Sequence, residues 1–282
     1  MTMDLYLKTC YEVSRLMTNR YSTSFSLGIK VFPKEAQDAI YGIYGFVRVA
    51  DEIVDTFQSC DKKILLEQFK KDVNGAIRAG VSTNPVLEVF QDVVKKYKID
   101  GEYIDAFLAS MEMDLTLKFH DKNSYDRYVY GSAEVIGLMC LKVFCAGNEP
   151  LFKELVVPAR KLGSAFQKVN FLRDIKNDLE ARGRIYLPGI RNKEDINEAA
   201  KKRMEAEVEE EFKVALDGIR KIPRSYVLAV YSVYLYYNAL FRKIKNLDAA
   251  FLLSKRVRIC DFHKLLLLIR AYFIVTFFGS RF

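Results

Sequence analysis

The sequence predicts an all-α protein, and three observations support this fold class. The chain of 282 residues contains only 14 glycines and 6 prolines, so long stretches carry no residue that breaks a helix. Within these stretches apolar residues recur at helical spacing, and hairpin signals are few. Half of the residues are hydrophobic, which is enough to bury a sizeable core. No linker rich in Gly, Ser or Pro divides the chain, so one domain is expected over residues 1–282.

The N-terminal half predicts three helices. Residues 3–20 have helical periodicity, and a segment that changes from polar to apolar follows and ends at Pro33. Residues 35–57 form a strongly amphipathic helix. A charged segment without an assigned helix comes next. The run Ser82-Thr83-Asn84-Pro85 then begins another helix, since polar residues followed by proline are typical of a helix start.

The C-terminal half continues the helical pattern, with a turn at Pro188-Gly189. The longest predicted helix contains Pro158 and is expected to break there, because proline removes a backbone donor and clashes with the preceding turn. A dense mixture of both charge signs over residues 191–213 is typical of a solvated helix. The predicted helices of this half cover residues 102–119, 124–145, 150–181, 194–220 and 224–246.

The last segment, residues 264–282, is very apolar but is interrupted by Arg270. No run reaches the roughly 18 apolar residues that a membrane-spanning helix needs. Two interpretations stay open: a helix of the core, or a helix that rests on a membrane surface. The second is favoured by basic side chains suited to anionic lipid, which are Lys255, Arg256, Arg258 and Lys264.

The net charge of +8 permits three kinds of partner: nucleic acid, an anionic membrane surface, or small phosphorylated substrates. Basic residues are spread along the chain instead of forming one arm, so nucleic acid is not the expected partner. The five cysteines are odd in number and irregular in spacing, which is typical of reduced thiols. No signal peptide is expected from the N-terminal residues. A cytoplasmic protein is predicted, with peripheral contact to the inner face of the membrane if the last helix is interfacial.

Two pairs of aspartates share one spacing. Asp51 and Asp55 stand four residues apart in "RVADEIVD", and Asp174 and Asp178 stand four apart in "NFLRDIKND". On a helix this spacing places both carboxylates on one face, where they repel each other. One such pair is common, but two pairs separated by about 120 residues require a shared explanation.

The surroundings of both pairs indicate that they point inward. Asp51 and Asp55 continue an apolar stripe, which normally faces the core, so their charge is costly unless a cation compensates it. Asp174 and Asp178 continue a polar stripe bordered by aromatic residues. A hydrogen-bonded polar seam is the structural alternative for either pair alone. The first stripe contains Ile40, Tyr44 and Val47, and the second contains Gly163, Gln167 and Asn170 between Phe166 and Phe171.

The residue types indicate the chemistry. Carboxylate and amide oxygens suit hard cations, above all magnesium with manganese as the alternative, and do not suit zinc or copper. Magnesium commonly takes one or two protein carboxylates and completes its octahedron with phosphate oxygens. Two facing acidic helices would then hold magnesium ions around a diphosphate. The remaining phosphate charge would be taken by nearby arginines, which are Arg48, Arg173, Arg182 and Arg184.

Two long motifs resemble the signature regions of the squalene/phytoene synthase family. They are "YSTSFSLGIKVFPKEAQDAIYGIYGFVRVADEIVD" and "LGSAFQKVNFLRDIKNDLEARGRIYLP", and the resemblance is closest to bacterial phytoene synthases. It extends over roughly residues 15–245. The second motif is the more specific, because Gln, Asn, both Asp residues, Arg-Gly-Arg and Tyr-Leu-Pro stand in order.

The resemblance implies an isoprenoid synthase fold, in which antiparallel helices surround a central cavity, and an enzyme that joins prenyl diphosphates. Tyr128 matches a family tyrosine implicated in handling the cation or its proton, although the chain reads "YVYGSAEVIG" where the family often has Tyr-Cys-Tyr and Val-Ala-Gly. By the same resemblance, the metal ligands are Asp51, Asp55, Asp174 and Asp178 with Asn170 in support, and the substrate-binding residues are Ser22, Arg48, Gln167, Asn170, Arg184 and Tyr237.

The implied reaction is head-to-head condensation of two geranylgeranyl diphosphates to phytoene, through a cyclopropylcarbinyl diphosphate. One alternative is a squalene or dehydrosqualene synthase that uses farnesyl diphosphate. Squalene formation requires NADPH, for which the sequence has no fingerprint, so NADPH is not expected. A second alternative is an inactive member of the family that acts as a membrane-associated assembly factor. The intact acidic pairs argue against it.

The length of the substrate tail is expected to depend on the helical face that begins at Ser22. Phe25 and Ile29 lie one and two turns beyond Ser22 on about the same face. Ile29 is therefore predicted to form the floor of the cavity, where a residue smaller than an aromatic one would leave room for a longer tail.

Overall fold

The computed structural model describes residues 3–22, 26 and 28–279, and every regular element in these ranges is helical. The prediction of an all-α fold is therefore confirmed. The only β-type pairing in the described part is an isolated bridge between Phe119 and Ile185. The α-helices are α1 (Met3–Tyr21), α3 (Lys34–Asp55), α4 (Lys62–Ala79), α5 (Pro85–Tyr97), α6 (Gly101–Thr116), α7 (Lys122–Val129), α8 (Val135–Cys145), α9 (Glu149–Asn177), α10 (Glu198–Ile219), α11 (Arg224–Lys245), α12 (Ala249–Ser254) and α13 (Asp261–Phe278).

The charged segment that follows residue 57 contains a helix, α4, which the sequence analysis missed. Its start is capped by Asp61, whose carboxylate accepts hydrogen bonds from the backbone N–H groups of Lys63 at 2.9 Å and Ile64 at 3.2 Å. Leu66, Phe69, Val73 and Ala76 are its buried apolar residues. These four residues form one narrow stripe, which the many lysines and acids around it obscure in the sequence.

The predicted break at Pro158 is wrong, because α9 continues through this residue from Glu149 to Asn177. Pro158 packs against Gly218 of α10. A Cβ atom on Gly218 would lie 2.2 Å from Cβ of Pro158, so only glycine permits this approach of the two helices. The proline ring thus serves as a packing element between α9 and α10.

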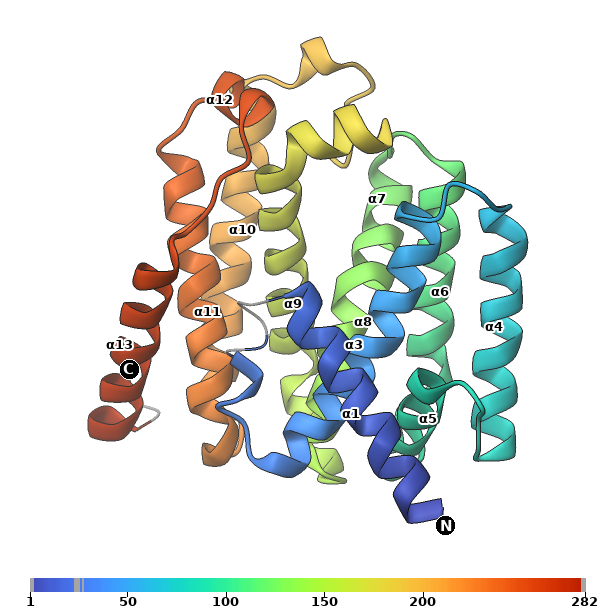
Figure 1. Cartoon of the computed structure of the whole chain (residues 1–282). Helices are drawn as coiled ribbons and strands as arrows, with labels where there is room; N and C mark the ends of the chain where they lie inside the picture. Colours follow the sequence, from blue (N-terminus) through green and yellow to red (C-terminus); the bar gives the residue numbers. More distant parts are fainter. Residues whose placement is uncertain (1–2, 23–25, 27, 280–282) are drawn as a thin grey trace.

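Helix α9 lies in the middle of the bundle, with α10, α11 and α13 on one side and α3 to α6 on the other (Figure 1). The N-terminal core is centred on Phe46, which is fully buried and stacks on Phe90 with ring centroids 3.9 Å apart. The second core gathers around α9, α10 and α11. By length and composition one described helical stretch, Lys122–Cys145, could cross a membrane. Most of that stretch is buried inside the protein, as expected of a core helix.

Candidate active site

An elongated apolar cavity of about 440 Å³ lies between the helices on both sides of α9. Apolar side chains line its closed end, among them Phe32, Phe144 and Ile222. Asp51 of α3 and Asn170 of α9 line its other end. A ligand with a long hydrocarbon tail and a charged head would match this polarity.

Ile29 does not have the position predicted for it. Its side chain is buried in the N-terminal core, and it is not among the described residues that line the cavity. The stacked rings of Phe32 and Phe144, with centroids 5.3 Å apart, form part of the closed end instead. Phe25 lies outside the described residues. The helical wheel could not give this result, since it fixes the face of a residue but not the helix against which that face packs.

The two aspartate pairs meet at the polar end of the cavity, and a single arginine connects them. Arg182 Nε lies 3.0 Å from Oδ2 of Asp55 on α3, and its Nη1 lies 2.7 Å from Oδ1 of Asp178. Asp178 and Arg182 belong to a π-helical turn, Asp178–Arg182, that extends α9. Such turns occur often at functional sites. The prediction that two acidic helices face each other is consistent with this geometry.

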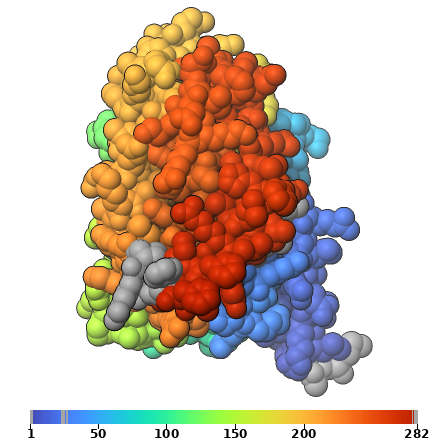
Figure 2. Space-filling model, turned by 90° about the vertical axis from the view of Figure 1, so that its left-hand side faces the viewer, coloured from blue at the N-terminus to red at the C-terminus, as the bar shows by residue number. Residues whose placement is uncertain are grey.

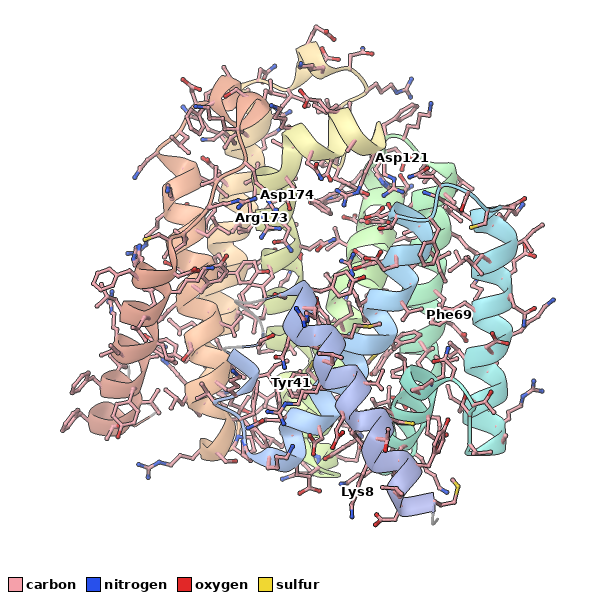
Figure 3. All side chains as sticks on the ribbon, in the orientation of Figure 1. Lys8, Tyr41, Phe69, Asp121, Arg173 and Asp174 are labelled. Carbon is pink, nitrogen blue, oxygen red and sulfur yellow. The ribbon has the colours of Figure 1, made fainter. Side chains whose placement is uncertain are left out.

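Further arginines neutralise the aspartates. Arg184 Nη1 lies 2.8 Å from Oδ1 of Asp55, and Arg173 Nε donates to both carboxylate oxygens of Asp174 at 3.1 Å. Arg173 and Asp174 are labelled side by side on α9 in Figure 3. Arg256, which precedes α13, places Nε 2.6 Å from Oδ1 of Asp174. The arginines therefore offset the repulsion between the aspartates without a bound ligand, and a phosphate group would have to compete for them.

The arginines compensate the charge of Asp51 and Asp178 only in part, since Arg48 is 3.8 Å from Asp51 and Arg182 is shared between Asp178 and Asp55. Burial is the largest cause that raises the pKa of each to about 7, and the neighbouring aspartates raise it further. The guanidinium of Arg48 is 3.8 Å from Asp51, because Arg48 pairs with Glu52 and lies over the ring of Tyr21. Among the described residues Arg48 Nε is buried without a hydrogen-bond partner. The site thus contains both an excess of carboxylate charge and an unused cationic donor.

These residues fit a magnesium site that is completed by substrate. Within the described part of the chain, no group of three or more His, Cys, Asp or Glu side chains is arranged to hold an ion alone. Magnesium, however, usually binds proteins through one or two carboxylates and takes phosphate oxygens and water as its other ligands. The excess charge of Asp51 and Asp178, and the oxygen-only donor set, fit this mode of binding.

The remaining predicted site residues line the same cavity. Ser22 is one of its lining residues, and Gln167 Nε2 donates to Ser132 Oγ at 3.3 Å. Tyr237 donates to Oδ1 of Asn170 at 3.3 Å. Its ring stacks on Phe166 of α9 with centroids 4.0 Å apart. The polar stripe of α9 therefore faces the cavity along most of its length.

Asp114 on α6 is a site residue that the sequence analysis missed. It accepts hydrogen bonds from Tyr128 Oη at 2.9 Å and Tyr186 Oη at 2.7 Å, and Arg184 Nη1 lies 3.5 Å away. Burial raises the pKa of Asp114 to about 6. A signal was present, because Phe107, Met111 and Asp114 follow the helical spacing i, i+4, i+7, so that an acid continues an apolar stripe as Asp51 does.

His120 packs against the two tyrosines that donate to Asp114. Its ring is almost fully buried, 5.0 Å from the ring of Tyr128 and 5.7 Å from that of Tyr186 between centroids. Burial lowers the pKa of His120, so the imidazole is neutral at pH 7. Backbone hydrogen bonds hold the segment that contains His120 to the residues that follow Arg-Gly-Arg. Ile185 N donates to Lys118 O at 2.8 Å, and Gly189 N donates to His120 O at 2.9 Å.

Comparisons with known proteins identify similar sequences. The family model described as squalene/phytoene synthase matches residues 18–262. A presqualene diphosphate synthase of Zymomonas mobilis is 33% identical over 171 residues, which cover 59% of this chain and 56% of the relative. A phytoene synthase of Arthrospira platensis is 30% identical over 189 residues, which cover 63% of this chain and 60% of the relative. The matched part thus spans somewhat more than half the length of these relatives.

Solved structures share the fold. A dehydrosqualene synthase in complex with a ligand superposes with a TM-score of 0.80 at 21% identity, and the match covers 96% of this chain and 98% of the other. The squalene synthase HpnC of Alicyclobacillus acidocaldarius superposes with a TM-score of 0.75 at 20% identity, covering 87% of this chain and 96% of the other. The isoprenoid synthase fold predicted from the motifs is therefore confirmed.

Proposed function

The chain belongs to the squalene/phytoene synthase family, and on this premise we propose that it condenses two geranylgeranyl diphosphates head to head into phytoene. The observation that carries the proposal is the polarity of the cavity. Its closed end is lined by apolar side chains, and its other end is lined by Asp51 and Asn170, beside which the other three aspartates lie among arginines. A prenyl diphosphate has the same division between tail and head.

The length of the cavity supports a twenty-carbon tail. Its wall on α9 extends from Leu155 to Asn170, which are about 22 Å apart at a rise of 1.5 Å per residue. With carbon–carbon bonds of about 1.5 Å, an extended geranylgeranyl chain is about 19 Å long and a farnesyl chain about 14 Å long. The geranylgeranyl tail is long enough to extend along most of this wall, whereas the farnesyl tail would leave the closed end of the cavity empty.

The first half-reaction breaks the C1–O bond of one substrate, and the double bond of the second substrate attacks the resulting allylic cation. The departing diphosphate accepts a proton from the C1 carbon that has just been joined, and the electron pair of that C–H bond closes the cyclopropane ring. Arg48 and Arg182 border the place where the departing diphosphate gains charge, and they would donate hydrogen bonds to its oxygens. Magnesium or manganese, held there by Asp51, Asp55, Asp174 and Asp178 with support from Asn170, would supply further positive charge to the diphosphate. The apolar walls exclude water that would trap the cation.

The second half-reaction breaks the remaining C1–O bond, rearranges the carbon skeleton and releases one more proton. Tyr128 lines the cavity and donates its phenol hydrogen to Asp114. A proton that reaches Tyr128 Oη would be relayed by transfer of that hydrogen to Asp114 Oδ2. The pKa of Asp114 near 6 makes this carboxylate a competent acceptor at pH 7. Proton loss gives phytoene without a reductant, so NADPH is not part of the proposal.

The competing function is condensation of farnesyl diphosphate, and it is favoured by the relative from Zymomonas mobilis, which is named presqualene diphosphate synthase. The third possibility is an inactive protein that assists assembly at a membrane. A cytoplasmic location is proposed for all three, and the five free cysteines support it.

The test is incubation of the purified protein with magnesium and either diphosphate, followed by mass determination of the products. The proposal expects a forty-carbon hydrocarbon from geranylgeranyl diphosphate. A product from farnesyl diphosphate alone would show that the enzyme uses the fifteen-carbon substrate. No product from either substrate, in a protein that melts cooperatively, would favour the inactive alternative.

Ala215→Phe is expected to change the preferred tail length. Ala215 lines the cavity one turn before Gly218, which packs on Pro158 of α9. Pro158 precedes Asp174 by 16 residues, or about 24 Å of helix, so a phenyl ring at position 215 would fill the closed end. We expect kcat/KM for geranylgeranyl diphosphate to fall at least 10-fold relative to that for farnesyl diphosphate.

The matched control is Val157→Phe, which enlarges an exposed side chain of α9 outside the cavity. A competition assay with both substrates measures the preference directly. An unchanged preference in the Ala215→Phe protein would show that the tail does not reach this part of the cavity.

A further inference from the structure

The outward side of α13 carries a strip of large apolar side chains. We call it the α13 strip, and Figure 2 shows the red segment that contains it lying on the surface of the molecule. All of these side chains are exposed, from 43% for Ile269 to 72% for Phe277. The strip consists of Phe262, Leu265, Leu266, Ile269, Tyr272, Phe273 and Phe277.

The strip is separate from the side of α13 that packs on the protein. Leu267, Ala271 and Val275 are buried on the side that contacts α11. At 100° per residue the strip covers about 140° of the helix, and Thr276 is the other residue within this arc. The arc contains no charged residue. A solvated helix would present polar residues there, and a continuous exposed apolar surface of this kind marks a contact site.

The charge around the strip indicates what would cover it. Residues 242–279 contain eight Lys and Arg and two Asp and no Glu, a net charge of +6 within a chain of +8. Lys245, Arg256 and Lys264 pair with Glu209, Asp174 and Asp261, so they are not counted toward this surface. The other cations of this segment are exposed, and they are Arg242, Lys243, Lys255, Arg258 and Arg270.

This charge favours a lipid surface over a second copy of the chain. In a symmetric dimer formed through α13 the same segment of both copies would meet, and the exposed cations of the two copies would repel each other. An anionic bilayer offers the opposite charge and an apolar layer beneath it. Insertion across the bilayer does not fit, because α13 contains Asp261, Lys264 and Arg270 and one of its sides is packed on the protein.

We propose that α13 is an interfacial helix, which lies in the plane of an anionic bilayer with the α13 strip among the acyl chains and the flanking arginines and lysines at the headgroups. The contact does not depend on the proposed reaction, but it would suit it. Helix α11 lies between α13 and the cavity, since Val230 and Val233 of α11 line the cavity wall. The docked enzyme would hold a hydrocarbon product one helix away from the lipid.

The test is sedimentation of the full-length protein with vesicles of phosphatidylglycerol and phosphatidylcholine, and with phosphatidylcholine alone. The strip variant carries Leu266→Ser, Ile269→Ser and Phe273→Ser. The control variant carries Leu16→Ser, Ile64→Ser and Val157→Ser, three apolar residues of other helices that are 58–66% exposed. We expect the strip variant to bind anionic vesicles at least 10-fold more weakly than wild type, and the control variant to bind within 2-fold.

A charge variant, Lys255→Gln with Arg258→Gln and Arg270→Gln, is expected to lose binding to anionic vesicles, and added salt should weaken binding of the wild type. The proposal is overturned if wild type does not bind, if the strip variant binds like wild type, or if wild type sediments without lipid as a dimer that the strip variant dissociates. Loss of helicity in the strip variant would also overturn it, since the strip would then be packed on the protein. Vesicle binding without any product in the enzyme assay would refute the proposed function and leave this inference standing.

Discussion

Asp51→Asn is expected to lower kcat at least 100-fold and, at the same time, to make the ligand-free protein slightly more stable above pH 7. The loss of turnover follows if Asp51 holds magnesium on the departing diphosphate, because removal of one such electrostatic contact costs about 10²–10³ in rate. The gain in stability follows from the position of Asp51 at the polar end of the cavity, where the guanidinium of Arg48 is 3.8 Å away.

The sign of the pH effect is set by the direction of the shift. Burial, the largest cause, raises the pKa of Asp51 from 3.8 to about 7 in the folded protein. The folded state therefore binds this proton more tightly than the unfolded state, and the associated stability is complete below about pH 4 and lost as the pH rises through 7. Asparagine does not titrate. The variant should match wild type near pH 4 and exceed it at pH 8 by about 1 kcal/mol, a figure reduced because the side chain is partly exposed.

Thermal unfolding at pH 5 and pH 8, with and without magnesium and inorganic diphosphate, measures both effects. Wild type should melt at a higher temperature with these ligands, since a ligand that binds only the folded state stabilises it. The variant should lose most of that increase. Asp126→Asn, at an exposed ion pair with Lys122, is the matched control and should change neither property. A variant that is destabilised without ligand by about 1–3 kcal/mol, yet keeps its response to ligand, would identify a structural polar seam.

Arg184→Ala is expected to destabilise the protein by about 3–5 kcal/mol, which corresponds to a fall of about 10 °C in melting temperature. The guanidinium is 9% exposed and connects two helices, since it lies 2.8 Å from Asp55 of α3 and 3.5 Å from Asp114 of α6. Its removal leaves the buried carboxylate of Asp114 without its arginine and leaves Asp55 with Arg182 alone. Burial raises the pKa of Asp114 to about 6, so protonation of Asp114 should make the destabilisation smaller at pH 5 than at pH 8.

The control is Arg220→Ala, which removes an arginine that is 36% exposed and pairs with Asp217, itself 70% exposed, at 2.8 Å. An exposed pair of this kind contributes less than about 1 kcal/mol. Arg184→Lys should restore only part of the stability, because an ammonium group cannot make the forked contacts of a guanidinium. If Arg184→Ala instead keeps its melting temperature and loses turnover, Arg184 acts on the diphosphate as the family resemblance implies.

The sequence was sufficient to predict a feature wherever the pattern of apolar and polar residues that indicates it lies within one helix. The all-α class, the stripe that ends at Asp51 and the polar stripe of α9 depend on periodicity within a single helix, and the structure has helices at these places. The same reasoning failed at α4, where charged residues outnumber a narrow buried stripe, and at Pro158, where a glycine on another helix accommodates the ring.

The sequence by itself determined that this protein is helical and that it carries two inward-facing acidic pairs, because helical periodicity is a property of neighbouring residues. Only the tertiary structure decided which cations compensate those acids. Arg182 joins Asp55 to Asp178, and Arg256 reaches Asp174 from 82 positions away. Asp114 became part of the site for the same reason, through phenols of two other segments. Coulomb interactions and hydrogen bonds act through space, and the separation of two residues along a chain says little about their distance once helices have packed.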